Sequence, residues 1–208
     1  MTRTASSLEP VMATVVLAAA LWFITFYLTF SSFWIKISLS ASSLAILSVS
    51  LQPDTLRRLR LNSKTILLGL ASALLLYLIF WAGKQVSTFL FPFAGQQIGS
   101  IYDKGEGMPK WMIFILLFCV TGPCEEIYWR GFLQRRLMER FGNFRGWLLA
   151  TVFYAGVHIW SFNFMLIGAA AVAGAFWGAM YWRLSDLTPV IVSHSIWSAV
   201  IFTLLPVP

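Results

Sequence analysis

Two adjacent carboxylates follow closely on a stretch of this chain that is apolar enough to lie in a membrane. Glu125 and Glu126 come after the uncharged segment WMIFILLFCV, and Arg130 follows about one helical turn later. The chain has only two histidines, His158 and His194, and both lie inside apolar segments. An ionisable side chain within a membrane is costly and is a candidate functional residue by default. A carboxylate together with imidazoles indicates general acid–base chemistry, such as the activation of a water molecule.

The spacing within this motif predicts different roles for the two carboxylates. On a helix, Glu126 and Arg130 are four residues apart, so they can form an ion pair. Glu125 points about 100° away from Glu126, so it is free to face the interior of a helical bundle as a general base. Gly122 and Pro123 predict a break or kink just before the carboxylates. Both acids would then lie in a first helical turn, where free N–H groups favour negative charge.

Each of these features has an ordinary structural explanation when it is taken alone. A Glu–Arg pair near a helix end is usually structural, and a buried histidine is usually a hydrogen-bonded core residue. The combination favours a functional site, because the chain has no other histidine and its six remaining acidic residues lie in predicted loops or at helix ends.

The composition predicts the elements that must position these residues. The chain has 208 residues, of which 59% are hydrophobic and 11% charged, and its mean hydropathy is +0.77. Soluble domains are about half apolar and a quarter charged, so we expect an all-α integral membrane protein with the lipid bilayer as its solvent. Residues 1–208 are expected to form one domain of about seven transmembrane helices, or six to eight, at roughly 20 residues each.

Seven apolar segments are candidate spans, although the second carries six serines and is weak. A long connection is expected over 84–110. Ala170, Gly174 and Gly178 in the sixth segment share one helix face and predict close helix packing. The segments are 11–33, 35–51, 65–81, the segment that starts at 111 and enters the motif, 146–162, 163–182 and 187–205.

The basic residues predict the orientation of the chain rather than a nucleic-acid partner. The net charge is +7, but the basic residues lie in short clusters between apolar segments. If all seven segments span, ten of the fifteen Lys and Arg residues fall on one side, which the positive-inside rule makes cytoplasmic. We therefore expect a multi-pass protein of the cell membrane with its N-terminus in the cytoplasm and its C-terminus outside. The ten residues are Arg3, Arg57, Arg58, Arg60, Lys64, Arg135, Arg136, Arg140, Arg145 and Arg183.

The motif residues resemble a known family of membrane proteins. The sequence EEIYWR is similar to the EExxxR motif of the CPBP family, intramembrane proteases related to CaaX prenyl endopeptidases and bacteriocin-processing proteins (also called the Abi family). The second family motif, Phe-x-x-x-His, resembles YAGVH, with Tyr154 in the Phe position. The third, His-x-x-x-Asn or Asp, resembles HSIWS, in which Ser198 stands in the Asn or Asp position. The resemblance covers about 111–204, the expected protease core.

The resemblance implies a role for each of these residues. Glu125 and His158 would activate a water for attack on a peptide carbonyl, and His194, with the residue at 198, would stabilise the oxyanion. The Ser198 hydroxyl is shorter than an Asn amide, so a water or another donor such as Trp197 would be needed. No cofactor is implied. Zinc held by Glu125, His158 and His194 is the alternative, since two histidines and one carboxylate bind zinc in some hydrolases.

Three functions remain open from the sequence. The first is an intramembrane endopeptidase that cuts a membrane-embedded or membrane-tethered peptide: a leader, a C-terminal anchor or a CaaX-like tail. The second is a non-proteolytic membrane scaffold or immunity protein, for which Ser198 would be an early sign of lost activity. The third is a transporter that uses the Glu and His residues as a proton relay, although such proteins often show inverted repeats and none is evident.

Overall fold

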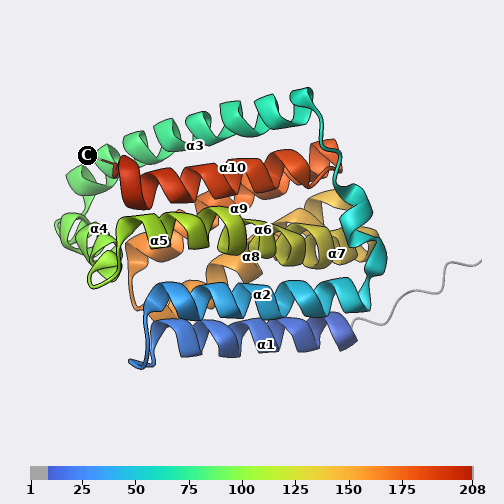
Figure 1. Cartoon of the computed structure of the whole chain (residues 1–208), viewed down its shortest axis with the longest axis horizontal. Coiled ribbons are helices and arrows are strands. Elements are labelled where there is room, and N and C mark those ends of the chain that lie inside the picture. The colour runs from blue at the N-terminus through green and yellow to red at the C-terminus, as the bar shows by residue number, and fades with distance from the viewer. Residues whose placement is uncertain (1–8, 208) are drawn as a thin grey trace, which may run out of the picture.

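The structure is a bundle of helices that lie side by side (Figure 1). It is a computed structural model that describes residues 9–207, and within this range it contains no strand. In chain order the elements are α1 (Glu9–Phe26), α2 (Phe33–Leu51), η1 (Pro53–Arg58), α3 (Ser63–Leu90), α4 (Ala94–Tyr102), η2 (Asp103–Gly105), α5 (Lys110–Ile115), η3 (Leu116–Thr121), α6 (Gly122–Glu126), η4 (Ile127–Gln134), α7 (Arg135–Phe141), α8 (Asn143–Val157), η5 (His158–Ser161), α9 (Phe164–Leu184), α10 (Thr188–Ala199) and η6 (Val200–Leu204).

Five helical stretches in the described residues are long and apolar enough to cross a membrane. Thr188–Leu204 forms a shorter apolar helix, and α8 has 15 residues. All seven predicted segments are therefore helical, and the prediction of an all-α, multi-pass membrane protein is confirmed. The five stretches are Glu9–Phe26, Phe33–Leu51, Ser63–Leu90, Lys110–Phe141 and Phe164–Leu184.

Several predicted boundaries differ from the observed ones. The first helix ends at Phe26 rather than Phe33, because the chain turns between α1 and α2, where Ser31 has a φ of 60°. The third helix continues to Leu90, well beyond the predicted end at 81. The connection expected over 84–110 is thus largely helical, formed by the end of α3 and by α4.

The break predicted at Gly122-Pro123 is not present, because Lys110–Phe141 is one continuous helical stretch. Thr121 and Gly122 keep right-handed helical dihedral angles, with φ of −63° and −55°. What changes there is the hydrogen bonding: η3 and η4 are π-helical, and the α-helical turn α6 lies between them. A wider π turn accommodates a proline, which has no N–H to donate to the preceding turn.

Gly122 is needed for a close helix contact instead. A Cβ atom at this position would lie 2.6 Å from the Ser195 Oγ and 2.9 Å from the Ser195 Cα. The stretch Lys110–Phe141, called the motif helix below, and α10 therefore approach closely beside the carboxylates.

The weak second segment forms a complete helix, because its serine hydroxyls bond within the protein. Ser48 donates to the Ala45 carbonyl at 2.8 Å, while Ser38 bonds the Thr121 hydroxyl at 2.9 Å. Hydroxyls that are satisfied in this way are tolerated in lipid and hold helices together.

The basic clusters gather at one end of the bundle, as predicted from the sequence. Figure 1 places η1, α7 and the junction of α9 with α10 at the same end, on the right of the view. Arg135 binds Asp54 at 2.8 Å, and the hydrogen bond from Arg135 lowers the pKa of the Asp54 carboxyl. Arg3 lies outside the described residues. The chain starts α1 at this end and ends at the other (Figure 1); which end is cytoplasmic stays a prediction.

The small residues of α9 have the packing role that their spacing predicts. A Cβ at Gly174 would lie 2.9 Å from the Tyr154 ring, and one at Gly178 would lie 2.8 Å from the Trp147 ring. The Gly178 carbonyl also accepts a hydrogen bond from the Gln134 side chain at 2.8 Å. The helix α9 is thus held directly against the motif helix and α8.

We expect Gly178→Ala to destabilise the fold, because the new methyl would overlap Trp147 and the Gln134 Oε1, which lies 2.9 Å away. Overpacking of this kind costs about 1–3 kcal/mol. Gly168→Ala on the same helix is the matched control, since a Cβ there meets nothing within 4 Å. Thermal unfolding of the purified protein in detergent measures the difference. Equal midpoints for the two variants would contradict the close packing of α9.

Candidate active site

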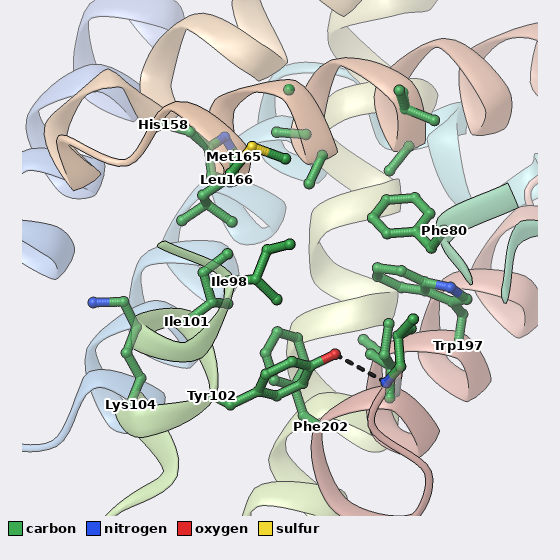
Figure 2. A pocket seen from close by; sticks show the side chains of 18 of the residues that line it. Phe80, Ile98, Ile101, Tyr102, Lys104, His158, Met165, Leu166, Trp197 and Phe202 are labelled. Atoms are coloured by element: carbon green, nitrogen blue, oxygen red, sulfur yellow. Dashed lines mark hydrogen bonds between the residues drawn. The ribbon is translucent and has the colours of Figure 1, made fainter. Parts of the chain in front are cut away.

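One cavity of about 430 Å³ contains all three residues predicted to be catalytic. Glu125 from α6, His158 from the end of α8 and His194 from α10 all line it, although they are far apart in the sequence. Most of its wall is apolar, and it extends from these residues toward α4. Figure 2 shows His158 at the upper edge, with Ile98 and Ile101 of α4 facing Phe80 and Trp197 across the space. The structure thus brings the three predicted residues to one cavity; their catalytic role stays a prediction.

Glu126 forms the ion pair that its spacing predicts, and it has a second partner that spacing could not reveal. Its Oε1 accepts a hydrogen bond from Arg130 at 2.9 Å, in a place where Glu126 is fully buried. The same oxygen is 2.6 Å from Nδ1 of His194. Because a carboxylate oxygen accepts, His194 donates from Nδ1, and its Nε2 is the nitrogen left for other partners.

Arg130 is enclosed by aromatic rings and a helix backbone. Its guanidinium lies 4.7 Å from the ring centre of Tyr154 and 5.6 Å from that of Trp177. It also donates to the Gly174 carbonyl at 3.3 Å. This cation is only 2% exposed. The Glu126 carboxylate, the two ring faces and the Gly174 carbonyl together stabilise it.

Glu125 has a different environment from its neighbour. One oxygen, Oε2, accepts a hydrogen bond from the Tyr154 hydroxyl at 3.0 Å. The other oxygen, Oε1, has no hydrogen-bond partner among the described residues, and Glu125 lines the cavity. The two carboxylates therefore divide as predicted: Glu126 is neutralised by Arg130, and Glu125 faces the cavity.

The ring of His158 is held by bonds on both nitrogens. Nδ1 lies 2.7 Å from the Tyr154 carbonyl, and Nε2 lies 3.4 Å from the indole nitrogen of Trp22. The indole N–H donates, so Nε2 is the accepting nitrogen and Nδ1 carries the proton. The contact to Trp22 is long, so a water in the cavity could replace the indole as the donor to the one lone pair of Nε2.

The position that carries Asn or Asp in the family motif is satisfied within its own helix. The Ser198 hydroxyl donates to the His194 carbonyl at 2.7 Å, so its proton is already used. The neighbouring Trp197 lines the cavity and packs on Phe80 and Trp177, with ring centres 4.6 and 5.7 Å apart. Its indole nitrogen has no acceptor in the part of the chain that the structure describes.

Two aromatic residues of the site were missed by sequence reasoning. Trp22 reaches His158 from the first helix, and Trp177 stacks on His194 with ring centres 3.9 Å apart. Trp22 gives no signal in its spacing, because its partner is 136 residues away. Trp177 lies on α9 three residues after Gly174, and the small residues there could have indicated what packs against them.

Metal binding is not decided by this arrangement. Within residues 9–207, no three His, Cys, Asp or Glu side chains are grouped as the ligands of a metal ion would be. The zinc alternative, with Glu125, His158 and His194, stays a prediction for a metal assay.

Comparison with family models gives a match over part of the chain. Residues 107–200 match the family model described as type II CAAX prenyl endopeptidase Rce1-like. The matched model is that of an Rce1-like domain of the CPBP family. The resemblance seen in the motifs is thus confirmed, and the family is one of proteases. The matched residues include Glu125, His158 and His194, whereas Trp22 lies before them. Comparisons with curated proteins and with solved structures found no match.

We expect Glu126→Gln to lower the thermal stability of the protein much more than Glu125→Gln does. Glu126→Gln leaves the buried Arg130 without its counter-charge, which costs about 3–5 kcal/mol, or roughly 6 °C or more in Tm. Glu125→Gln keeps an oxygen that accepts from Tyr154. Detergent-solubilised variants are compared by thermal unfolding. A similar loss of Tm in both would show that the two carboxylates do not differ in this way.

Proposed function

We propose that this chain is an intramembrane glutamic endopeptidase that cuts a membrane-tethered or membrane-embedded peptide. One observation carries the proposal: Glu125 is anchored by Tyr154 through one oxygen and lines a cavity that His158 and His194 share. A base held in this way, beside a neutral imidazole with an accepting nitrogen, can bind and activate a water.

In the proposed reaction, Glu125 takes a proton from a water that it holds together with Nε2 of His158. The resulting hydroxide attacks the carbonyl carbon of the peptide bond, and the carbonyl oxygen becomes an oxyanion. Glu125 then gives the proton to the leaving nitrogen as the C–N bond breaks, which yields a carboxyl and an amine product. The same carboxyl group serves as base and then as acid.

His194 is the proposed donor to the oxyanion, through Nε2. It must then carry protons on both nitrogens, because Nδ1 donates to Glu126. Such a charge is balanced in the buried cluster: the two carboxylates of Glu125 and Glu126 offset Arg130 and a protonated His194. Glu126 thereby orients the imidazole, as a buried carboxylate does for the histidine of other hydrolases.

The position of the cavity bears on the class of substrate. It lies in the half of the bundle that carries α4, away from the end that gathers the basic clusters (Figure 1). If that basic end is cytoplasmic, the cavity faces the exported side. This favours a leader or a C-terminal anchor of an exported protein over a CaaX-like tail, which is prenylated in the cytoplasm.

We expect Glu125→Gln to reduce peptide hydrolysis by about 100-fold or more, the contribution of a general base. Protein reconstituted in liposomes is assayed on a pool of quenched fluorescent peptides, and cleaved peptides are then studied singly. Glu139→Gln is the control, because Glu139 lies on the same helical stretch and is half exposed. Cleavage that survives in Glu125→Gln would rule out the glutamate base.

The same assay separates the other candidate functions. Stoichiometric zinc whose removal by a chelator abolishes cleavage would favour the metalloprotease. Proton-coupled flux in the liposomes would favour the transporter. A cellular role that persists in Glu125→Gln would favour the scaffold or immunity protein.

We expect Ser198→Ala to leave the rate of hydrolysis within about threefold of the parent protein. The Ser198 hydroxyl donates to the His194 carbonyl, so it has no proton to offer an oxyanion. Loss of an oxyanion donor costs about 100-fold or more in kcat, which is the loss expected for His194→Ala. If Ser198→Ala had a comparable effect on kcat, the hydroxyl would have to leave the helix carbonyl during the reaction.

A further inference from the structure

The last described part of the chain folds back into the cavity. After η6 the backbone leaves the helix, and the Leu205 N–H closes the turn on the Val200 carbonyl at 2.8 Å. Val207, two residues later, is 5% exposed and lines the cavity together with Glu125 and His194. A short stretch of non-helical peptide thus lies in the same space as the proposed catalytic residues.

Two side chains bind the backbone of Val207 on both of its polar atoms. The Val207 N–H donates to the Tyr102 hydroxyl at 3.1 Å, the bond that is dashed in Figure 2. The Lys84 ammonium donates to the Val207 carbonyl at 2.9 Å. Tyr102 comes from α4 and Lys84 from α3, so the two helices hold one residue between them. Neither bond depends on the identity of the side chain at 207.

Several other polar side chains of this wall are engaged within the protein, whereas the indole nitrogens of Trp34 and Trp197 have no acceptor among the described residues. Ser87 donates to the Gly83 carbonyl at 2.6 Å, and Thr121 bonds Ser38. Lys104 lies over the ring of Phe33 at 5.1 Å. Lys84 and Tyr102 differ from these residues, because the partner they bind is a non-helical peptide backbone.

A peptide that enters an apolar cavity loses the water bonded to its N–H and C=O groups, and these groups must find partners in the protein. Lys84 and Tyr102 offer a donor and an acceptor placed to satisfy both groups of one extended residue. We propose that Lys84 and Tyr102 form a main-chain binding site for the peptide substrate, a site that Val207 of the chain itself occupies in this structure. The ligand class is an extended peptide with apolar side chains.

This proposal rests on the proposed peptidase function and adds a consequence to it. The segment around Val207 is tethered, so it competes with a free peptide at a high effective concentration. A chain without this segment binds peptide more tightly, and the gain depends on the two side chains that hold the backbone.

The test measures binding in a background that cannot cleave by the proposed mechanism. Glu125→Gln protein in detergent is titrated against a fluorescein-labelled peptide with the sequence of residues 203–208, and anisotropy is read. We expect the chain that ends at Leu205 to bind this peptide about tenfold more tightly than the full chain. Adding Tyr102→Phe and Lys84→Met to the shorter chain is expected to abolish the gain. Tyr27→Phe, an exposed tyrosine outside the cavity, is the matched control.

Equal affinity of the long and short chains, or a gain that survives Tyr102→Phe with Lys84→Met, overturns the proposal. Should the shortened chain fail to fold, Val207→Pro in the full chain removes the N–H that Tyr102 accepts, and Val207→Ala keeps it. Tighter peptide binding in Val207→Pro than in Val207→Ala supports the site, and equal binding overturns it. Since binding is read without cleavage, failure of the glutamate mechanism in the hydrolysis assay is a separate result.

Discussion

The rest of the structure depends on the two hydrogen bonds that Glu126 accepts, one from Arg130 and one from His194. Two carboxylates side by side in an apolar bundle repel each other and lose their water, so at least one must be matched by charge and hydrogen bonds. A single oxygen of Glu126 accepts from Arg130 and from His194. Arg130 in turn reaches the Gly174 carbonyl. Glu126 and Arg130 thereby join their own helix to α10 and α9, and Glu125 lines the cavity.

The aromatic residues around this centre hold the two histidine rings in place. Trp177 stacks flat on His194, and Trp22 meets the edge of His158. Tyr154 contributes its hydroxyl to Glu125, its carbonyl to His158 and its ring face to Arg130. This one residue, at a position where the family motif has Phe, contacts the proposed base, the imidazole and the guanidinium.

Much of the fold and of the site geometry could be predicted from the sequence, because local spacing and composition determine it. The Glu126–Arg130 pair follows from four residues on one helix, and the apolar segments follow from composition. What spacing could not supply was the bond of Glu126 to His194, which joins residues 68 apart. The π-helical turns around Gly122 were also missed, since a Gly-Pro pair normally indicates a break and here a wider turn accommodates it. The proposed roles of Lys84 and Tyr102 depend on the folded-back segment around Val207, which no local sequence pattern indicates.

The turn between α1 and α2 connects α4 to the proposed catalytic centre. Lys104, just after α4, lies 5.6 Å from the ring centre of Phe26 and 5.1 Å from that of Phe33, and burial lowers the pKa of this ammonium. Phe26 in turn meets the His158 ring, with centres 5.7 Å apart. Lys104 and Phe26 thus form a chain of contacts from the end of α4 to the His158 imidazole, so a displacement of α4 that admitted a bulky peptide would be transmitted to that ring.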